Sequence, residues 1–164
     1  MNEALQFGYA RLPRNWAKEN WETLEIPDSR VAKISEALGR IPKGTELFVH
    51  NNCGVVVREL LKKFQLSQIS GVDFVEYFKG AMGKSEPLKI VEKDIVVIYN
   101  LGLEPAINLT FSAKLLKGLL KQLEQYECIV ILQSDTPYSK ISREYEIEFS
   151  SKITIPYIKH KALL

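Results

Sequence analysis

Cysteine is scarce in this sequence, and the other marks of a secreted or membrane-bound chain are missing as well. The 164 residues include two cysteines, Cys53 and Cys128, which are too few for a disulfide scaffold and lack the spacing of a metal site. No apolar run approaches the roughly 20 residues that a membrane-spanning helix needs. Residues 1–16 hold no basic segment followed by an apolar one, so no signal peptide is evident. We therefore expect a reduced, intracellular protein in the cytoplasm, with no membrane contact.

The chain also has little net charge. Lys and Arg number 22 against 20 Asp and Glu, which leaves a net charge of +2. A strong footprint for nucleic acid needs a more basic domain or a clear basic stripe, so any DNA binding must come from local clusters. A hydrophobic share of 46% excludes disorder, and the length suits one domain. We expect an N-terminal arm at 1–27, an α/β domain at 28–156 and a tail at 157–164.

Apolar patterning predicts that strands and helices alternate along the chain. Helices are expected at 29–38, 54–64, 71–81 and 112–126, and strands at 46–50, 66–69, 94–99, 128–132 and 152–155. Asp28 or Ser29 is the predicted N-cap of the first helix. The run at 94–99 is continuously apolar, which is typical of a parallel strand buried on both faces. The alternation predicts an α/β domain with a mostly parallel sheet.

The segment after strand 46–50 lies where a parallel sheet binds ligands, beyond the carboxyl end of a strand. A working phosphate loop there needs glycines, a Lys for the phosphates and a Ser or Thr for magnesium. Only Gly54 is present, and the positions expected for Lys and for Ser or Thr hold Val56 and Val57. We therefore expect no ordinary magnesium-ATP binding at a degenerate loop made of His50, Asn51, Asn52, Cys53, Gly54, Val55, Val56 and Val57.

The expected magnesium site shows the same loss. In ATP-binding folds of this kind a strand ends in acidic residues that hold the metal. Here strand 94–99 leads into Tyr99 and Asn100, and neither supplies a carboxylate. Losses at two separate sites predict a chain that does not hydrolyse ATP, with no cofactor and no bound metal.

The order of these segments resembles the AAA+ ATPases of the bacterial helicase-loader group, the DnaC and DnaI type. Similar segments are 10–16 and 21–24 before the ATPase core, 44–57 at the phosphate loop, 70–79 after it, and 94–105 at the magnesium strand with its Leu-Gly-x-Glu-Pro turn. Residues 129–141 resemble the strand that ends in a polar sensor residue. The Ser-Asp-x-Pro motif at 134–137 also resembles a motif of the related replication-initiator family. The resemblance covers most of residues 9–156.

This resemblance implies a P-loop NTPase-like three-layer sandwich with a mostly parallel five-stranded sheet and no separate lid domain. It makes Asp135 the candidate sensor residue. Arg143 stands where an arginine finger is possible by position, and a surface role is the more ordinary interpretation. The departures at the two ATP sites remove the catalytic residues and leave the fold intact.

Several other residues have both a functional and an ordinary interpretation. His50 and Cys53 are either a metal or nucleophile pair or a loop remnant with a buried thiol. Asp94 is either a catalytic acid or a surface residue at the start of a strand.

Basic residues gather in three places. Arg11, Arg14, Trp16 and Lys18 combine positive charge with an aromatic platform, a pairing used for single-stranded DNA, unless the arm packs its Trp residues on the domain. Lys114, Lys117 and Lys121 share a helix face that contacts phosphates or an acidic partner, or is merely solvated. The basic tail at 157–161 is expected to be disordered.

We therefore expect a catalytically inactive AAA+-like binding module in DNA replication, with a replicative helicase, a helicase loader or another AAA+ subunit as its partner. Two alternatives stay open. One is a DNA-binding accessory factor that uses the basic faces. The other is a protein that binds a small anion or nucleotide at the altered loop. The balanced charge favours a protein partner.

Overall fold

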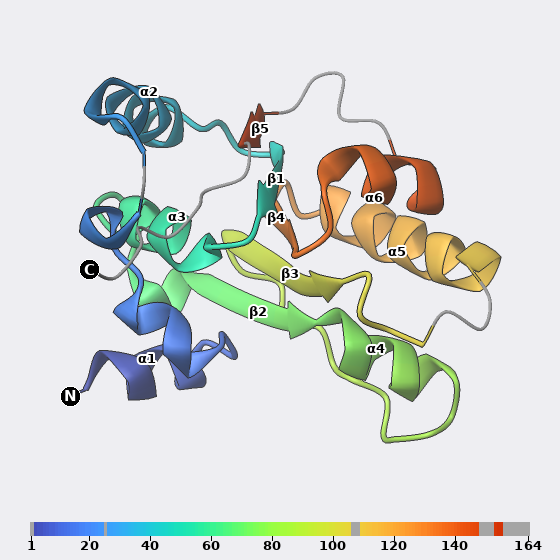
Figure 1. Ribbon diagram of the computed structural model, residues 1–164. Helices are drawn as coiled ribbons and strands as arrows, with labels where there is room; N and C mark the ends of the chain where they lie inside the picture. The colour runs from blue at the N-terminus through green and yellow to red at the C-terminus, as the bar shows by residue number, and fades with distance from the viewer. Residues whose placement is uncertain (1, 25, 106–108, 148–152, 156–164) are drawn as a thin grey trace.

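The computed structural model describes residues 2–24, 26–105, 109–147 and 153–155, so the tail at 157–164 lies outside the described residues (Figure 1). Its centre is one sheet with the strand order β2-β3-β4-β1-β5, and every pairing is parallel. The strands are β1 (Glu46–His50), β2 (Ile69–Asp73), β3 (Ile95–Leu101), β4 (Ile129–Ser134) and β5 (Ile153–Ile155). The predicted α/β class with a parallel sheet is confirmed.

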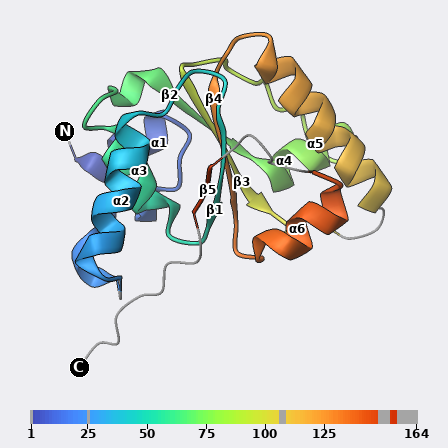
Figure 2. The same ribbon diagram turned by 90° about the horizontal axis from the view of Figure 1, so that it is seen from above.

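Helices cover both faces of the sheet, which gives three layers (Figure 2). One face carries α1 (Glu3–Tyr9), α2 (Asp28–Gly39) and α3 (Cys53–Leu60), and the other carries α4 (Phe74–Ala81), α5 (Leu109–Glu124) and α6 (Tyr138–Tyr145). Successive strand residues point to opposite faces. Val49 and Val97 thus belong to the core under α3, whereas Phe48 and Ile98 belong to the core under α5.

The inner strands and α5 follow the predicted patterns closely. All residues of β4 are buried, as are Ile95–Ile98 in β3, so both strands are covered on two faces. In α5, Leu116, Leu119 and Leu123 are buried and Lys114, Lys117 and Lys121 are exposed. Among the described helices, none has the length and apolar character needed to cross a bilayer.

The sequence prediction is wrong between residues 66 and 81. The segment predicted as a strand at 66–69 begins as a 3-10 helix, η3 (Leu66–Gln68), and β2 takes the first residues of the helix predicted at 71–81. The side chain of Asp73 accepts a hydrogen bond from the Val75 backbone N–H at 3.0 Å. Because this cap fixes the start of α4 at Phe74, the residues before it are free to pair with β3.

Other boundaries also differ from the prediction. The N-cap of α2 is Pro27, with Asp28 already in the first turn, and α3 ends at Leu60 instead of residue 64. The sequence analysis did not predict α1 or α6. In α6 only Ile141 and Tyr145 are buried, so the apolar pattern of this helix is too sparse to identify it.

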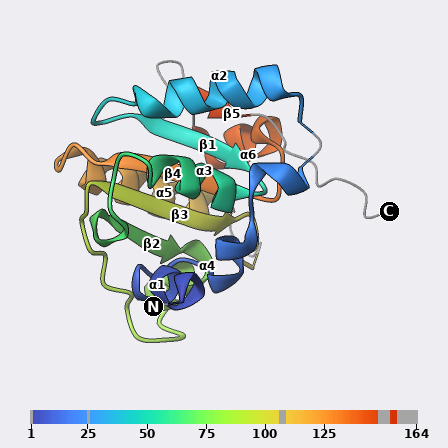
Figure 3. The same cartoon turned by 90° about the vertical axis from the view of Figure 1, so that its left-hand side faces the viewer.

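The N-terminal segment belongs to the core of the domain. Besides α1 it contains the 3-10 helices η1 (Arg14–Lys18) and η2 (Trp21–Thr23), and Phe7, Leu12, Trp16 and Leu24 are buried in the cluster that holds α3. The Gly71 backbone N–H donates to the Ala10 carbonyl at 2.8 Å, so the segment covers the outer edge of β2. Figure 3 shows α1 beside β2 at one end of the sheet and α2 beside β1 and β5 at the other.

Candidate functional site

A polar cavity lies at the carboxyl ends of β1 and β4. The helix after β1, α3, lies on one face of the sheet, and the helix after β4, α6, lies on the other, so the two connections diverge there (Figure 2). Ligands bind α/β sheets in the crevice at such a point. The cavity has a volume of about 490 Å³, and its polar lining comes from Asn15, Glu19, Asn51, Asn52, Asn100, Gln133 and Asp135. The structure thus brings together residues of the predicted loop, strand end and sensor position.

The connection from β1 to α3 is very short. Only Asn51 and Asn52 separate the two elements, and both adopt positive φ, at 59° and 34°. The Asn51 backbone N–H donates to the Ser134 carbonyl at 2.9 Å, which ties the turn to the end of β4. A phosphate cradle needs a longer glycine-rich turn whose N–H groups converge on the ligand. This two-residue turn does not provide one.

Glu19 occupies the N-terminus of α3. Its Oε2 accepts a hydrogen bond from the Gly54 backbone N–H at 2.6 Å. Burial raises the pKa of the Glu19 carboxyl, the Gly54 N–H lowers it, and the negative charge of Asp135 raises it further, with a net upward shift. A helix N-terminus attracts anions through its free N–H groups and its dipole. Here the anion is a side chain of the protein itself.

Gly54 allows this contact because it has no side chain. A Cβ at this position would lie 2.5 Å from both the Trp16 carbonyl oxygen and Glu19 Oε2. The segment that contains η1 therefore passes directly over the first turn of α3. Gly54 thus serves here for close approach of the chain's own backbone.

The two positions at which the sequence analysis looked for the Lys and the Ser or Thr of a phosphate loop, Val56 and Val57, are inaccessible. Val55, Val56 and Val57 are all fully buried and belong to the core between α3 and the sheet. Cys53 is 1% exposed, and burial followed by the nearby Glu19 charge raises the pKa of its thiol well above the ordinary value. The His50 ring lies 3.0 Å from the Asp135 backbone oxygen through Nε2. Within the described part of the chain, no group of three or more His, Cys, Asp or Glu side chains is placed to hold a metal.

Tyr99, at the end of β3, is part of the packing of the N-terminal segment. Its hydroxyl donates to the Arg11 carbonyl at 3.1 Å, and its ring meets that of Trp16 edge-on with centroids 5.4 Å apart. Burial, with the charges of Asp73 and Glu76, raises the pKa of Tyr99 to about 12. Tyr99 is therefore a neutral, structural group at neutral pH.

Asn100 and Asp135 are joined through Gln133. The Asn100 backbone N–H donates to Gln133 Oε1 at 3.0 Å, and Gln133 Nε2 donates to Asp135 Oδ1 at 3.1 Å. Asn100 Nδ2 also lies 3.4 Å from Asp73 Oδ1, so the line of hydrogen-bonded side chains extends to the end of β2. The predicted sensor residue Asp135 is exposed at the rim of the cavity.

The predicted basic contact residues lie elsewhere. Arg11 and Arg14 are exposed, but Trp16 is 7% exposed, so its ring offers no open face on which a base could stack. On α5, Lys117 pairs with Glu146 at 3.2 Å. These basic residues do not line the cavity, and as contacts for DNA or a partner they stay a prediction.

Asp94 and Arg143 have the surroundings of surface residues. Both are exposed, and Asp94 accepts a hydrogen bond from Gln68 Nε2 at 2.7 Å. This contact agrees with the ordinary interpretation of Asp94.

Sequence reasoning missed two carboxylates that the fold places inside. One is Glu19, whose contact with Gly54 depends on how η1 packs and has no spacing signal. The other is Glu59, which accepts hydrogen bonds from Trp21 Nε1 at 2.6 Å, Ser35 Oγ at 2.8 Å and Lys62 Nζ at 3.0 Å. Burial raises the pKa of Glu59, but these three donors outweigh it and the net shift is downward.

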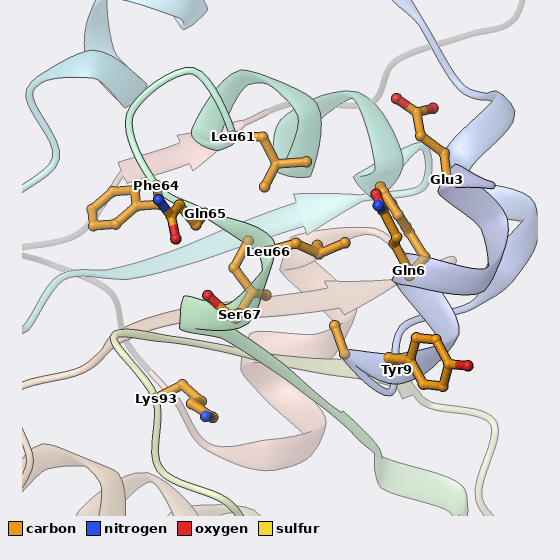
Figure 4. A pocket seen from close by; sticks show the side chains of 12 residues that line it. Glu3, Gln6, Tyr9, Leu61, Phe64, Gln65, Leu66, Ser67 and Lys93 are labelled. Carbon is orange, nitrogen blue, oxygen red and sulfur yellow. The ribbon is translucent and has the colours of Figure 1, made fainter. Parts of the chain in front are cut away.

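A second hollow, of about 730 Å³, lies between α1 and the connection from α3 to β2. In Figure 4 the side chains of Leu61 and Leu66 extend into it, and Tyr9 stands at its edge. Its walls are largely apolar, and charged groups such as Glu3 and Lys93 lie at its margin. The polar part of its lining comes from Glu3, Gln6, Tyr9, Gln65, Ser67 and Lys93.

Comparisons with known proteins identify the fold. No family model and no curated protein matches the chain. A solved protein from Streptococcus pyogenes serotype M3, provisionally described as a primosome component, is 10% identical with a TM-score of 0.50, over 98% of this chain and 100% of that one. DnaI is 15% identical with a TM-score of 0.53, over 86% of this chain and 81% of that one. At such identities the similarity shows a shared α/β fold alone.

Proposed function

We propose that this chain is a catalytically inactive AAA+-like binding module of DNA replication. Its partner in this proposal is a replicative helicase, a helicase loader or another AAA+ subunit. The α/β fold supports the AAA+ part of the proposal. The descriptions of the two neighbours, a primosome component and DnaI, support the connection with replication.

The observation that carries the proposal is the hydrogen bond from the Gly54 N–H to the Glu19 carboxylate. A phosphate bound at the N-terminus of α3 would have to displace Glu19 and then lie near Asp135, which carries the same sign of charge. No Lys or Arg lines the cavity to offset this repulsion, among the residues that the structure describes. These features disfavour the alternative of a small-anion or nucleotide site at the altered loop.

The loss of catalysis is tested by titrating the purified chain with magnesium-ATP in a calorimeter and by assaying phosphate release. We expect no binding heat at about 1 mM nucleotide, because a phosphate would have to displace Glu19 from the Gly54 N–H and lie near Asp135. Magnesium-dependent hydrolysis that follows the protein through every purification step would overturn the claim of inactivity.

The partner is tested by capture on the tagged chain, using nuclease-treated lysate of the host and mass identification of bound proteins. We expect the replicative helicase or an ATPase of its pathway. Recovery of neither would contradict the proposed role. The DNA-binding alternative is tested on the same preparation with single-stranded DNA at rising salt, since phosphate contacts by Lys114 and Lys121 would weaken steeply with salt.

A further inference from the structure

We propose that a groove at the amino ends of the parallel strands binds an extended segment of a protein partner, in which apolar side chains alternate with Asp or Glu. The groove lies at the opposite end of the sheet from the polar cavity, so the inference goes beyond the proposed function and holds for a partner of any pathway. The continuity of the groove, its exposed aromatic side chains and the pairing of its charges carry the inference.

The groove consists of three hollows that run into one another. The hollow of about 730 Å³ beside α1 shares Ser67 and Lys93 with one of about 380 Å³. The latter shares Asp94 and Tyr126 with a third, of about 220 Å³. The lining follows the order of the strands in the sheet, with Ser67 before β2, Asp94 before β3, Tyr126 before β4 and Lys43 before β1. Neighbouring strands are about 4.8 Å apart, so a ligand that crosses all four covers roughly 15 Å, the length of about five extended residues.

The groove presents apolar surface that the described part of the chain does not cover. Tyr9 is 75% exposed and Tyr126 is 57% exposed, and neither ring has an aromatic partner among the described residues. Leu61, Phe64 and Leu66 are only partly buried against the core and line the hollow beside α1, where Figure 4 shows Leu61 and Leu66 extending into it. Tyrosines of this kind are frequent anchors in protein interfaces, because a large rigid ring gives contact area at a small cost in entropy.

The charges of the groove leave its lysines without acidic partners. Among the described residues, neither Lys43 nor Lys93 takes part in an ion pair, and Lys63 Nζ lies 3.5 Å from the Gly39 carbonyl oxygen. Three of the four lining acids already have a donor from the chain, namely Arg58 for Glu3 at 2.6 Å, Gln68 for Asp94 at 2.7 Å and Gln122 for Glu92 at 3.2 Å. The charges still open to a ligand are therefore mostly positive, which selects for carboxylates.

An extended segment fits both features at once. Its successive side chains point in opposite directions, so apolar side chains at every second position face the floor of the groove. The acidic side chains between them then lie at the rim, where a flexible lysine side chain can reach them.

The test uses the full chain labelled with 15N and two capped peptides of seven residues. The acidic peptide is Glu-Leu-Asp-Leu-Asp-Leu-Glu, and its neutral counterpart is Gln-Leu-Asn-Leu-Asn-Leu-Gln, which has nearly the same shape. We expect the acidic peptide to shift the amide signals of Ser67, Asp94 and Tyr126 with a Kd below about 1 mM, and the neutral peptide to bind at least about tenfold more weakly. Equal affinities, or no shifts with the acidic peptide, would overturn the inference.

A reversal of charge locates the site. Lys93 is exposed and has no ion pair, so Lys93→Glu is expected to fold. This variant should bind the acidic peptide about tenfold more weakly and should gain affinity for Lys-Leu-Lys-Leu-Lys-Leu-Lys. Lys121→Glu makes the same change at an exposed lysine of α5 outside the three hollows, and it should leave both affinities as they are in the unmodified chain. If Lys93→Glu behaves like Lys121→Glu, the assignment fails.

Two other occupants are distinguished in the absence of any peptide. A dimer in sedimentation that Tyr9→Ser dissociates would assign the groove to a second copy of the chain and overturn the inference. Nuclear Overhauser contacts between the Leu66 methyl groups and residues 157–164 would assign it to the chain's own tail, with the same consequence. A monomer without such contacts is the expected result. These measurements use no lysate, so their outcome is independent of the capture experiment that tests the proposed function.

Discussion

Replacing Gly54 with Ala tests the central contact of the site directly. The new Cβ would lie 2.5 Å from the Trp16 carbonyl oxygen, which is backbone and cannot rotate away, and 2.5 Å from Glu19 Oε2. The segment that contains η1 must therefore move off α3. That movement breaks the 2.6 Å hydrogen bond from the Gly54 N–H to Glu19 and disturbs the burial of Trp16.

The expected change in the free energy of unfolding follows from two destabilising contributions and one stabilising contribution. Forcing extra volume into a packed contact costs about 1–3 kcal/mol. Loss of the charged hydrogen bond adds about 1 kcal/mol, toward the low end for such bonds because Glu19 is partly exposed. The better helix propensity of Ala offsets at most about 1 kcal/mol. We expect a net loss of about 1–3 kcal/mol, which lowers Tm by roughly 3–10 °C in a domain of this size.

Urea unfolding followed by circular dichroism measures this loss, and Gly118→Ala is the matched control. Gly118 also lies in a helix, but a Cβ there meets no atom within 4 Å, so the same substitution should stabilise the chain by about 0.5–1 kcal/mol. Opposite signs at the two glycines are the expected result. If Gly54→Ala is as stable as Gly118→Ala, the packing of η1 over α3 and the role of Glu19 at the helix end are both refuted.

Three further predictions concern buried groups. The folded-state pKa of Glu59 lies below its ordinary value of 4.5. The stability that the Glu59 carboxylate adds is therefore complete above that pH and is lost as the pH falls through the lowered pKa. Urea unfolding between about pH 3 and pH 7 should show a steeper fall in the free energy of unfolding towards acid pH for the unmodified chain than for Glu59→Gln. Tyr145 is 1% exposed, and its hydroxyl contacts Glu104 and the Gly102 N–H. Tyr145→Phe should therefore lower the free energy of unfolding by about 1–3 kcal/mol. The control Tyr126→Phe, at a residue that is 57% exposed, should change it by less than about 0.5 kcal/mol. Cys53 and Cys128 are free and buried, so a chromogenic disulfide reagent should label neither in native buffer and both in urea; rapid native labelling of Cys53 would contradict its burial.

The sequence predicted well those elements whose apolar pattern is set by burial on both sides. Strand β1 spans the predicted residues, and β3 and β4 differ from theirs by one or two positions at each end, because a run of Val, Ile and Leu bounded by polar residues has no other stable place in a sheet. The stripe of α5 was equally clear, since its leucines recur at helical spacing against exposed lysines.

The failures have an equally physical origin. Strand β2 contains Ser70 and Gly71, which carry little strand signal, and the glycine is needed because a Cβ there would lie 2.3 Å from the Arg11 carbonyl oxygen. That constraint comes from the N-terminal segment lying along the sheet edge, a tertiary contact between residues far apart in sequence. The position of Glu19 was hidden for the same reason. Local spacing predicted which side chains end the strands, and only the fold shows which distant carboxylate meets them.

The difference between a bound phosphate and Glu19 is one of tethering as well as charge. A free anion loses translational and rotational freedom on binding, whereas Glu19 is already part of the chain and competes at an effective concentration of roughly millimolar or more. An external phosphate must overcome this competitor, tolerate the nearby Asp135 and do so without a Lys, at a helix end whose next three residues are buried valines. The fold thus keeps a crevice at the carboxyl ends of the strands, while the chain's own Glu19 fills the helix end that a phosphate would use.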